Sequence, residues 1–313
     1  MTITQLQYVL AVAEHKNFTL AAEKCFVTQP TLSMQIQKIE EELKIQIFDR
    51  TKKPIQLTDI GQKIVNQAKN IVNEANRIKD IVEQQKGFIG GEFRLGIIPT
   101  IMPTLLPMFL NNFIKKYPKV KLIIEELNTD EIILRLKNGH LDAAIAATPL
   151  MEEKLKEIVL YYEPFVAYIP ENHKIANKLE IEVSDLNLDE ILLLQDGHCF
   201  RDGILNLCKN QGVVSGNSFQ LESGSFETLI RLADEGLGTT LLPFLHTLDL
   251  KEKDKSKLHH FKEPKPAREV SLVFPKTELK IHIIEALRQT IAGVIKGAIV
   301  FQNVEIISPI SKK

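Results

Sequence analysis

Two cysteines, Cys199 and Cys208, lie nine positions apart just after the apolar run 191–194, which we expect to be a strand. If Cys199 begins a helix there, nine helical residues set the two Cα atoms about 13 Å apart. A disulfide requires Cα atoms about 4.4–6.8 Å apart. The two thiols can therefore join only if the segment between them leaves its helical form, which is the behaviour of a redox switch.

The environment of Cys199 decides whether it reacts, because the thiolate is the nucleophile and its pKa must fall below the ordinary value of about 8.5. A helix N-terminus supplies N–H groups and partial positive charge, and His198 and Arg201 add donors. Inert packing of both cysteines is the simpler alternative, and Cys25 fits it. A zinc site would need a CxxC pair or a fourth ligand, so we expect no metal and no cofactor.

Two threonines follow strand-like runs elsewhere in the chain. Thr100 ends the segment Gly96-Ile-Ile-Pro-Thr100 and Thr129 follows the run Lys121–Glu125. Hydroxyls in such places point to the strand-end crevice where α/β proteins bind ligands. Helix capping is the simpler explanation of both positions.

The composition limits the classes of protein to which this chain can belong. The 313 residues are 44% hydrophobic and 25% charged, with a net charge of −1 and three cysteines. The charge gives no overall attraction to polyanions, so any nucleic acid must be met by a local feature. No apolar run approaches about 18 residues and no secretory signal begins the chain, so we expect a cytoplasmic protein without a membrane partner.

The first 60 residues are predicted to be helical, with an apolar helix face at 6–13, a short helix at 18–27, a turn at Thr28–Pro30 and a longer helix at 31–43. Two short strands at 47–57 flank a basic tip, as in a wing. Helical periodicity then continues from Thr58, an expected N-cap, to Gln85. Its single apolar seam suits a partner helix and predicts a homodimer: Ile64, Ala68, Ile71, Ala75, Ile78 and Val82.

A domain boundary is predicted at about 86–91, where Gly87, Gly90 and Gly91 interrupt the helix. Beyond it, strand-like and helical segments alternate, which indicates an α/β domain. Pro164 and Pro266 flank a central stretch that we expect to be a subdomain. The chain would enter and leave it through two paired crossover segments. The residues from 302 to 313 are expected to be a peripheral tail.

The N-terminal module resembles the LysR-type transcriptional regulators. The resemblance rests on Ala21-Ala-Glu, Val27-Thr-Gln-Pro-Thr-Leu-Ser33, Ile39-Glu-Glu-Glu-Leu43, Phe48-Asp-Arg50 and Leu57-Thr-Asp-Ile-Gly61. It implies an all-α winged helix-turn-helix at 1–60, a linker and dimerisation helix at 61–88, and a two-lobed α/β regulatory domain at 89–301 like that of periplasmic solute-binding proteins. Lobe I would be about 91–162 plus 269–301, and lobe II about 163–268.

In that module, phosphate contacts are expected from the polar and basic residues of the turn and wing, and base-edge contacts from the longer helix. Pro30 lies in the turn before it. The phosphate set is Thr28, Thr31, Arg50, Lys52 and Lys53, and the base-reading set is Gln29, Ser33, Gln35 and Lys38. A solvated turn is the simpler interpretation of the basic wing.

Within the family, the chain resembles the peroxide-sensing members, through Gly96-Ile-Ile-Pro-Thr100, Gly197-His-Cys-Phe-Arg-Asp202, Cys208 and Gly236-Leu-Gly-Thr-Thr-Leu-Leu-Pro243. This implies that hydrogen peroxide oxidises Cys199 to a sulfenic acid, which condenses with the resolving Cys208. The implied peroxide pocket is Thr100, Thr129, His198, Asp202 and Arg268. The sequence has Lys265-Pro-Ala-Arg268 where two adjacent arginines would be expected.

The implied partners are double-stranded promoter DNA, further copies of the chain as dimer and tetramer, RNA polymerase, and glutaredoxin or glutathione as reductant. The implied role is activation of antioxidant genes. A regulator that senses a small organic effector between the lobes is the nearest rival, with incidental cysteines. A thiol peroxidase that turns over many equivalents of peroxide is a rival of another class.

Overall fold

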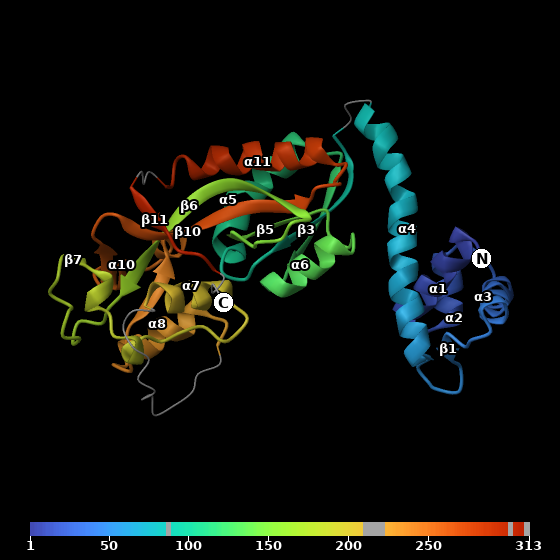
Figure 1. Ribbon diagram of the computed structural model, residues 1–313, viewed down its shortest axis with the longest axis horizontal. Coiled ribbons are helices and arrows are strands. Elements are labelled where there is room, and N and C mark those ends of the chain that lie inside the picture. The colour runs from blue at the N-terminus through green and yellow to red at the C-terminus, as the bar shows by residue number, and fades with distance from the viewer. Residues whose placement is uncertain (86–88, 209–222, 300–302, 310–313) are drawn as a thin grey trace. The chain divides into compact units, whose positions relative to one another are not determined.

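The structure is a computed structural model that describes residues 1–85, 89–208, 223–299 and 303–309 (Figure 1). Its contacts separate into two compact units. Met1–Gly87 forms the first, to which Asn138–His140 are also assigned, and Phe88–Lys137 with Leu141–Lys313 form the second. None of the described helices is long and apolar enough to cross a membrane.

The first unit begins with three helices, α1 (Ile3–His15), α2 (Phe18–Lys24) and α3 (Gln29–Leu43). Polar residues cap each of them, because Thr2, Asn17 and Thr28 accept main-chain N–H groups of the first turn. Two short antiparallel strands follow, β1 (Phe48–Asp49) and β2 (Gln56–Leu57). The predicted helix-turn-helix and wing are therefore confirmed.

Helix α4 (Asp59–Gln85) begins where the sequence predicts, because the Thr58 hydroxyl accepts the Gly61 N–H at 2.9 Å. Gly61 also allows a close approach, since a Cβ there would collide with the Ile47 carbonyl. The helix packs against α1 and closes the core of the first unit.

The apolar seam of α4 divides into two parts, which the sequence did not predict. Ala68 is buried in the core of the first unit, and Ile64 and Ile71 pack against that core, so these residues serve their own domain. Ile78 has an exposed fraction of 66%, and Ala75 is half-buried. The Val82 side chain lies outside the described residues. Only the C-terminal part of the seam is thus open to a partner helix.

The first lobe of the second unit has three parallel strands, β3 (Gly91–Ile97), β4 (Val120–Glu126) and β5 (Ala143–Thr148). Helices α5 (Met102–Lys116), α6 (Thr129–Lys137) and α11 (Ile281–Ile295) supply apolar residues to one core with these strands. Strand β5 is buried along its whole length, as expected for a parallel strand covered on both faces.

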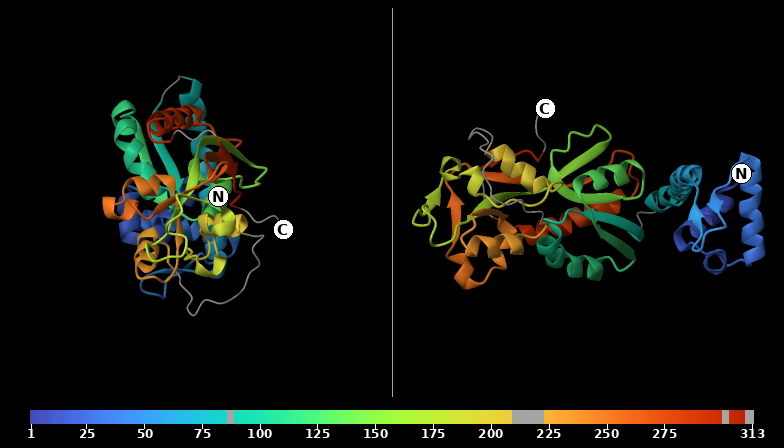
Figure 2. Two further views of the ribbon diagram at one scale, coloured as in Figure 1. Left: turned by 90° about the vertical axis from the view of Figure 1, so that its left-hand side faces the viewer. Right: turned by 90° about the horizontal axis from the view of Figure 1, so that it is seen from below.

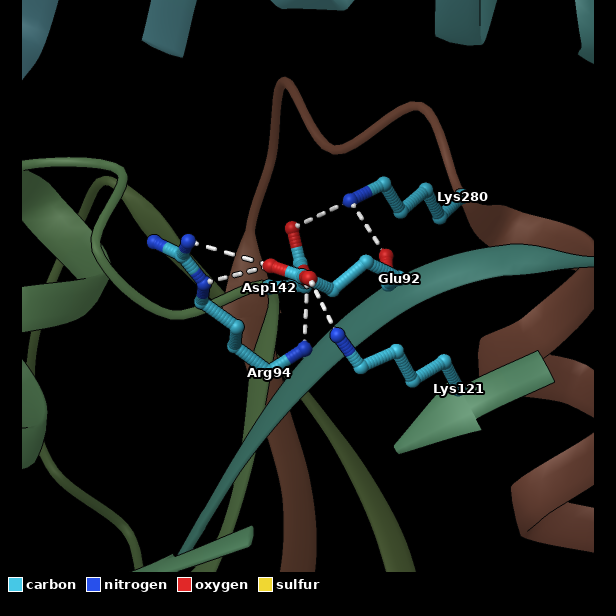
Figure 3. Close-up of polar contacts among 5 residues, drawn as sticks. All are labelled: Glu92, Arg94, Lys121, Asp142 and Lys280. Carbon is cyan, nitrogen blue, oxygen red and sulfur yellow. Dashed lines mark hydrogen bonds and ion pairs between the residues drawn. The ribbon is translucent and has the colours of Figure 1, made fainter. Parts of the chain in front are cut away.

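Hydrogen bonds and ion pairs among charged residues stabilise the edge of this lobe where the chain enters it (Figure 3). The Lys280 ammonium donates to the Asp142 carboxylate at 3.0 Å and to the Glu92 carbonyl at 2.9 Å. Asp142 also accepts the Arg94 main-chain N–H at 2.7 Å, and Glu92 pairs with the Arg94 and Lys121 side chains. The starts of β3, β5 and α11 are thereby held together.

Two long antiparallel strands, β6 (Leu155–Tyr168) and β10 (Lys265–Pro275), run from the first lobe to the second (Figures 1 and 2). Pro164 lies opposite Ala267 in this pair, which confirms the predicted crossovers. The sheet order is β4-β3-β5-β10-β6-β9-β7, and β8 also pairs with β6. The two-lobed α/β fold expected from the sequence is confirmed.

The second lobe has its own hydrophobic core. Its elements are β7 (Glu180–Ile181), η1 (Val183–Asp185), η2 (Leu188–Glu190), α7 (Cys199–Leu207), α8 (Phe226–Asp234), β8 (Thr240–Pro243), α9 (Phe244–Leu248), α10 (Glu252–Lys255) and β9 (Leu258–Phe261).

Two expectations for this lobe were wrong. The run 191–194 is largely buried but forms only an isolated bridge between Ile191 and Thr239, where the Leu192 N–H donates to the Thr239 carbonyl at 2.7 Å and no ladder follows. The chain end is not peripheral where it is described. Strand β11 (Val304–Ile306) pairs in parallel with β10, and the Asn206 side chain of α7 donates to the Ser308 carbonyl at 2.8 Å.

Candidate redox site and DNA-binding surface

Helix α7 places the two cysteines at its opposite ends. Cys199 is its first residue after the N-cap His198, and Cys208 is its C-cap. Both thiols are free. The predicted helix is confirmed, and its nine residues set the Cα atoms about 13 Å apart.

The two cysteines also belong to different hydrophobic cores. Cys199 packs with the core of the first lobe, whereas Cys208 packs with that of the second, together with Phe200 and Ile204 of α7. A disulfide therefore requires that α7 unwind and that at least one sulfur leave its core.

The Cys199 thiol is buried, with an exposed fraction of 7%, but polar groups surround it. Burial raises its pKa, while the Arg268 charge, the Thr129 hydroxyl and the Ala147 main chain lower it and Asp202 raises it again. The net direction is upward, because burial outweighs the opposing groups. The expectation of a lowered pKa was therefore wrong for the helical form of α7.

Thr129 and Thr100 do not cap helices. Asn128 caps α6 by accepting the Glu131 N–H at 2.8 Å, and the residue preceding α5 is Ile101. The buried Thr129 hydroxyl has no partner that meets hydrogen-bond geometry, and its contact with the Cys199 sulfur is a loose one that lowers the thiol pKa. This hydroxyl is thus free to bind a small polar molecule beside the sulfur.

Arg268 is the cation of the site, and it is itself buried, with an exposed fraction of 3%. It donates to the Thr100 hydroxyl at 2.8 Å and to the Thr100 carbonyl at 3.1 Å. Its guanidinium lies over the Phe200 ring, 5.1 Å from the centroid. The structure therefore brings Thr100, Arg268 and the start of α7 together.

Sequence reasoning missed Glu163, whose carboxylate pairs with Arg268 at 2.7 Å. The two residues face each other across β6 and β10. A glutamate in the otherwise apolar end of β6 was the available signal, because a buried carboxylate requires a partner.

His198 and Asp202 flank Cys199 through α7. Burial lowers the pKa of His198, so its imidazole is neutral near pH 7, and burial raises the pKa of Asp202. No hydrogen bond joins either side chain to the Cys199 sulfur among the described residues. Burial raises the pKa of Cys208 to about 11, so its thiol is unreactive while α7 is helical.

The helix-turn-helix presents much of the predicted DNA-binding set at its surface. The side chains of Gln29, Lys38, Lys52 and Lys53 are exposed, and Thr28 caps α3 while bonding the Thr31 hydroxyl at 2.8 Å. Pro30 lies in the first turn of the helix.

Three further members of that set, Arg50, Ser33 and Gln35, also have internal partners. Arg50 donates to Glu40 at 2.9 Å and to Ser33 at 3.4 Å, and its guanidinium lies over the Phe18 ring. Gln35 accepts from Gln5 at 3.2 Å. Arg50 is therefore first a structural residue of the wing.

Comparison with known proteins places the two units in one family. The family described as "Bacterial regulatory helix-turn-helix protein, lysR family" matches residues 3–62, and "LysR substrate binding domain" matches residues 86–295. The "Hydrogen peroxide-inducible genes activator" of Pectobacterium carotovorum subsp. carotovorum is 35% identical over 88% of this chain and 90% of its own. The "DNA-binding transcriptional dual regulator OxyR" of Escherichia coli K12 is 34% identical over 94% and 97%.

Solved structures agree with these relatives. A full-length OxyR cysteine variant of Pseudomonas aeruginosa is 33% identical, with a TM-score of 0.73 over 93% of this chain and 98% of that one. An H2O2-bound OxyR mutant of Corynebacterium glutamicum is 28% identical, with a TM-score of 0.63 over 97% and 98%. The chain therefore belongs to the LysR family of bacterial helix-turn-helix regulators, and within that family it is related to the OxyR proteins.

Proposed function

We propose that this protein is a hydrogen-peroxide-sensing transcriptional regulator that activates antioxidant genes. One observation carries the proposal: two free thiols occupy opposite ends of a single helix and pack in separate cores. The relatives named as hydrogen peroxide-inducible genes activators support it.

The proposed chemistry takes place in two steps. The Cys199 thiolate attacks one oxygen of H2O2, the O–O bond breaks, and the departing hydroxide takes a proton to leave as water, so that Cys199 becomes a sulfenic acid. The Cys208 thiolate then attacks that sulfur, an S–S bond forms, and a second water leaves. Each disulfide consumes one peroxide.

The Cys199 pocket would bind peroxide through the residues around it. The Thr129 hydroxyl and the Arg268 guanidinium would donate to the peroxide oxygens, and Thr100 would keep Arg268 in place. His198 and Asp202 would position peroxide and a water from the N-terminal turn of α7. Donors aimed at the departing oxygen lower the barrier to O–O cleavage.

The signal would pass from α7 to the DNA-binding unit through subunit packing. A disulfide would unwind α7 and alter how regulatory domains pack, so that a dimer or tetramer re-spaces its α3 helices on promoter DNA. RNA polymerase would respond to that rearrangement. Glutathione or glutaredoxin would reduce the disulfide in the cytoplasm.

The proposed domains are a DNA-binding domain at 1–60, a linker at 61–88 and a regulatory domain at 89–301. The regulatory lobes would be about 91–162 plus 269–301 and about 163–268.

Footprinting on promoter DNA tests the function. The reduced protein and the protein treated with one equivalent of H2O2 should protect different lengths of DNA, and Cys199→Ser should give only the reduced footprint. Cys25→Ser is the matched control and should respond like the parent protein. If oxidation does not change the footprint of the parent protein, peroxide sensing would be contradicted and the small-effector alternative favoured.

A further inference from the structure

The carboxylate of Glu163, on β6, binds two other structural elements at once, β10 and α9. Its Oε2 atom accepts from Arg268 Nε at 2.9 Å and from Arg268 Nη2 at 2.7 Å. Its Oε1 atom accepts the Leu245 N–H of α9 at 2.9 Å. Because Glu163 has an exposed fraction of 1%, solvent does not screen these interactions.

Arg268 has further contacts that do not depend on Glu163. The two hydrogen bonds to Thr100 and the stacking on Phe200 hold the guanidinium from the first lobe and from α7. Phe200 follows Cys199 directly. The arginine is thus the group through which Glu163 acts on the sulfur.

We propose that Glu163 is a positioning residue for peroxide sensing: it neutralises the charge of Arg268 beside Cys199 and so keeps the sensor below its maximal peroxide reactivity. This inference rests on the proposed function. The charge of this buried carboxylate would then set the peroxide concentration at which the protein responds.

The remaining charged and titratable groups around the pair do not replace Glu163. Asp202 of α7 faces Cys199, as does the uncharged hydroxyl of Thr129 of α6. Two further groups, Tyr161 of β6 and His246 of α9, lie near Arg268. Burial raises the pKa of Tyr161 well above its ordinary value and lowers the pKa of His246, so both side chains are neutral at pH 7. Among the described residues, Asp202 is the carboxyl group that raises the pKa of the Cys199 thiol directly.

The test is Glu163→Gln in a Cys208→Ser background, where only the first oxidation step occurs. Removing the carboxylate charge should lower the Cys199 pKa and so raise the thiolate fraction at pH 7 about tenfold. The lower basicity reduces intrinsic nucleophilicity by about threefold, so oxidation by H2O2 should be about threefold faster. The pH profile of Cys199 alkylation by iodoacetamide should move to lower pH.

The matched control is Glu157→Gln on the same strand, because Glu157 also accepts a leucine N–H, at 2.9 Å, but pairs with no arginine among the residues that the structure describes. It should leave both the rate and the profile unchanged. Arg268→Gln should slow oxidation, and Glu163→Gln added to it should cause no further shift. Equal shifts with and without Arg268 would overturn the proposal, as would an unshifted profile in folded Glu163→Gln.

If Glu163→Gln does not fold, Glu163→Asp retracts the carboxylate by one methylene and should move the profile in the same direction by less. An unshifted profile there would overturn the proposal. Failure of the proposed function would look different: Cys199 of the parent would not be oxidised by H2O2, while its alkylation profile would still report on Glu163.

Discussion

The Cys199 thiol lies in a pocket where burial and charge oppose each other. Arg268 and the donors around the sulfur favour the thiolate, but burial of the thiol disfavours it, and Glu163 pairs with the arginine. The reduced protein is therefore expected to react with peroxide more slowly at pH 7 than an optimally activated cysteine would.

The first prediction concerns pH. Since the Cys199 pKa is raised, the thiol predominates at pH 7, and alkylation of Cys199 should accelerate about tenfold per pH unit from pH 7 to 8.5. Cys208, with a pKa of about 11, should react more slowly throughout. Stopped-flow alkylation followed by peptide mass spectrometry measures both, and a plateau for Cys199 below pH 8 would contradict the assignment.

A second prediction separates the two thiols. In Cys208→Ser, H2O2 should leave Cys199 as a sulfenic acid that a dimedone probe captures, since no resolving thiol follows. Cys25→Ser should behave like the parent, because Cys25 lies in the other unit beside the core of the helix-turn-helix. Capture at Cys208 in Cys199→Ser with equal yield would show that the roles are not distinct.

The sequence predicts some of these residues and not others, for physical reasons. Cys199, Cys208 and Thr100 lie in short local motifs whose elements form as expected. Arg268 was expected in the pocket from the family resemblance, but its partner Glu163 lies 105 positions away and meets it only through the pairing of β6 with β10. The sign of the Cys199 pKa shift depends on that pairing and on burial, which no local pattern encodes.

At the scale of elements, α7 must be stable enough to separate the sulfurs and weak enough to unwind. Gly203 lies in its middle, and glycine lowers helix stability relative to alanine. An added Cβ there would meet the Phe165 ring at 3.5 Å, an ordinary van der Waals contact. The glycine is therefore not required by packing in the helical state.

The third prediction follows. Gly203→Ala should stabilise α7 by about 0.5–1 kcal/mol and so slow disulfide formation about two- to fivefold, without changing the sulfenic acid step. The matched control is Gly293→Ala in α11, where a Cβ meets nothing within 4 Å. Quenched-flow thiol trapping measures both steps. Faster disulfide formation in Gly203→Ala would contradict a mechanism that unwinds α7.

Elements with strong periodicity were predictable, and those defined by distant partners were not. The amphipathic pattern of α3 and the cap of α4 lie in continuous sequence. The apolar run 191–194 has strand composition but lacks a full ladder partner, and β11 becomes a strand only because β10 offers an edge.

At the scale of the whole molecule, assembly is expected to depend on the C-terminal part of α4. The N-terminal part of its seam is already used within the first unit, so among the described side chains of the seam the exposed Ile78 is the most available to a partner helix.

The fourth prediction is that the protein forms a dimer through this seam and that Ile78→Lys converts it to a monomer, because a charge would be desolvated in a helix–helix seam. Gln67→Lys is the matched control, since Gln67 is exposed on the same helix but outside the seam. Sedimentation velocity at micromolar concentration measures both. A dimer that survives in Ile78→Lys would show that the seam is not the interface.

The central claim is that peroxide joins two thiols that an intact helix keeps apart. Peptide mass spectrometry after one equivalent of H2O2, combined with hydrogen exchange across residues 199–208, tests it most directly. The predicted result is a Cys199–Cys208 crosslink accompanied by faster exchange in α7. An uncrosslinked pair, or a crosslink with α7 still protected, would contradict it.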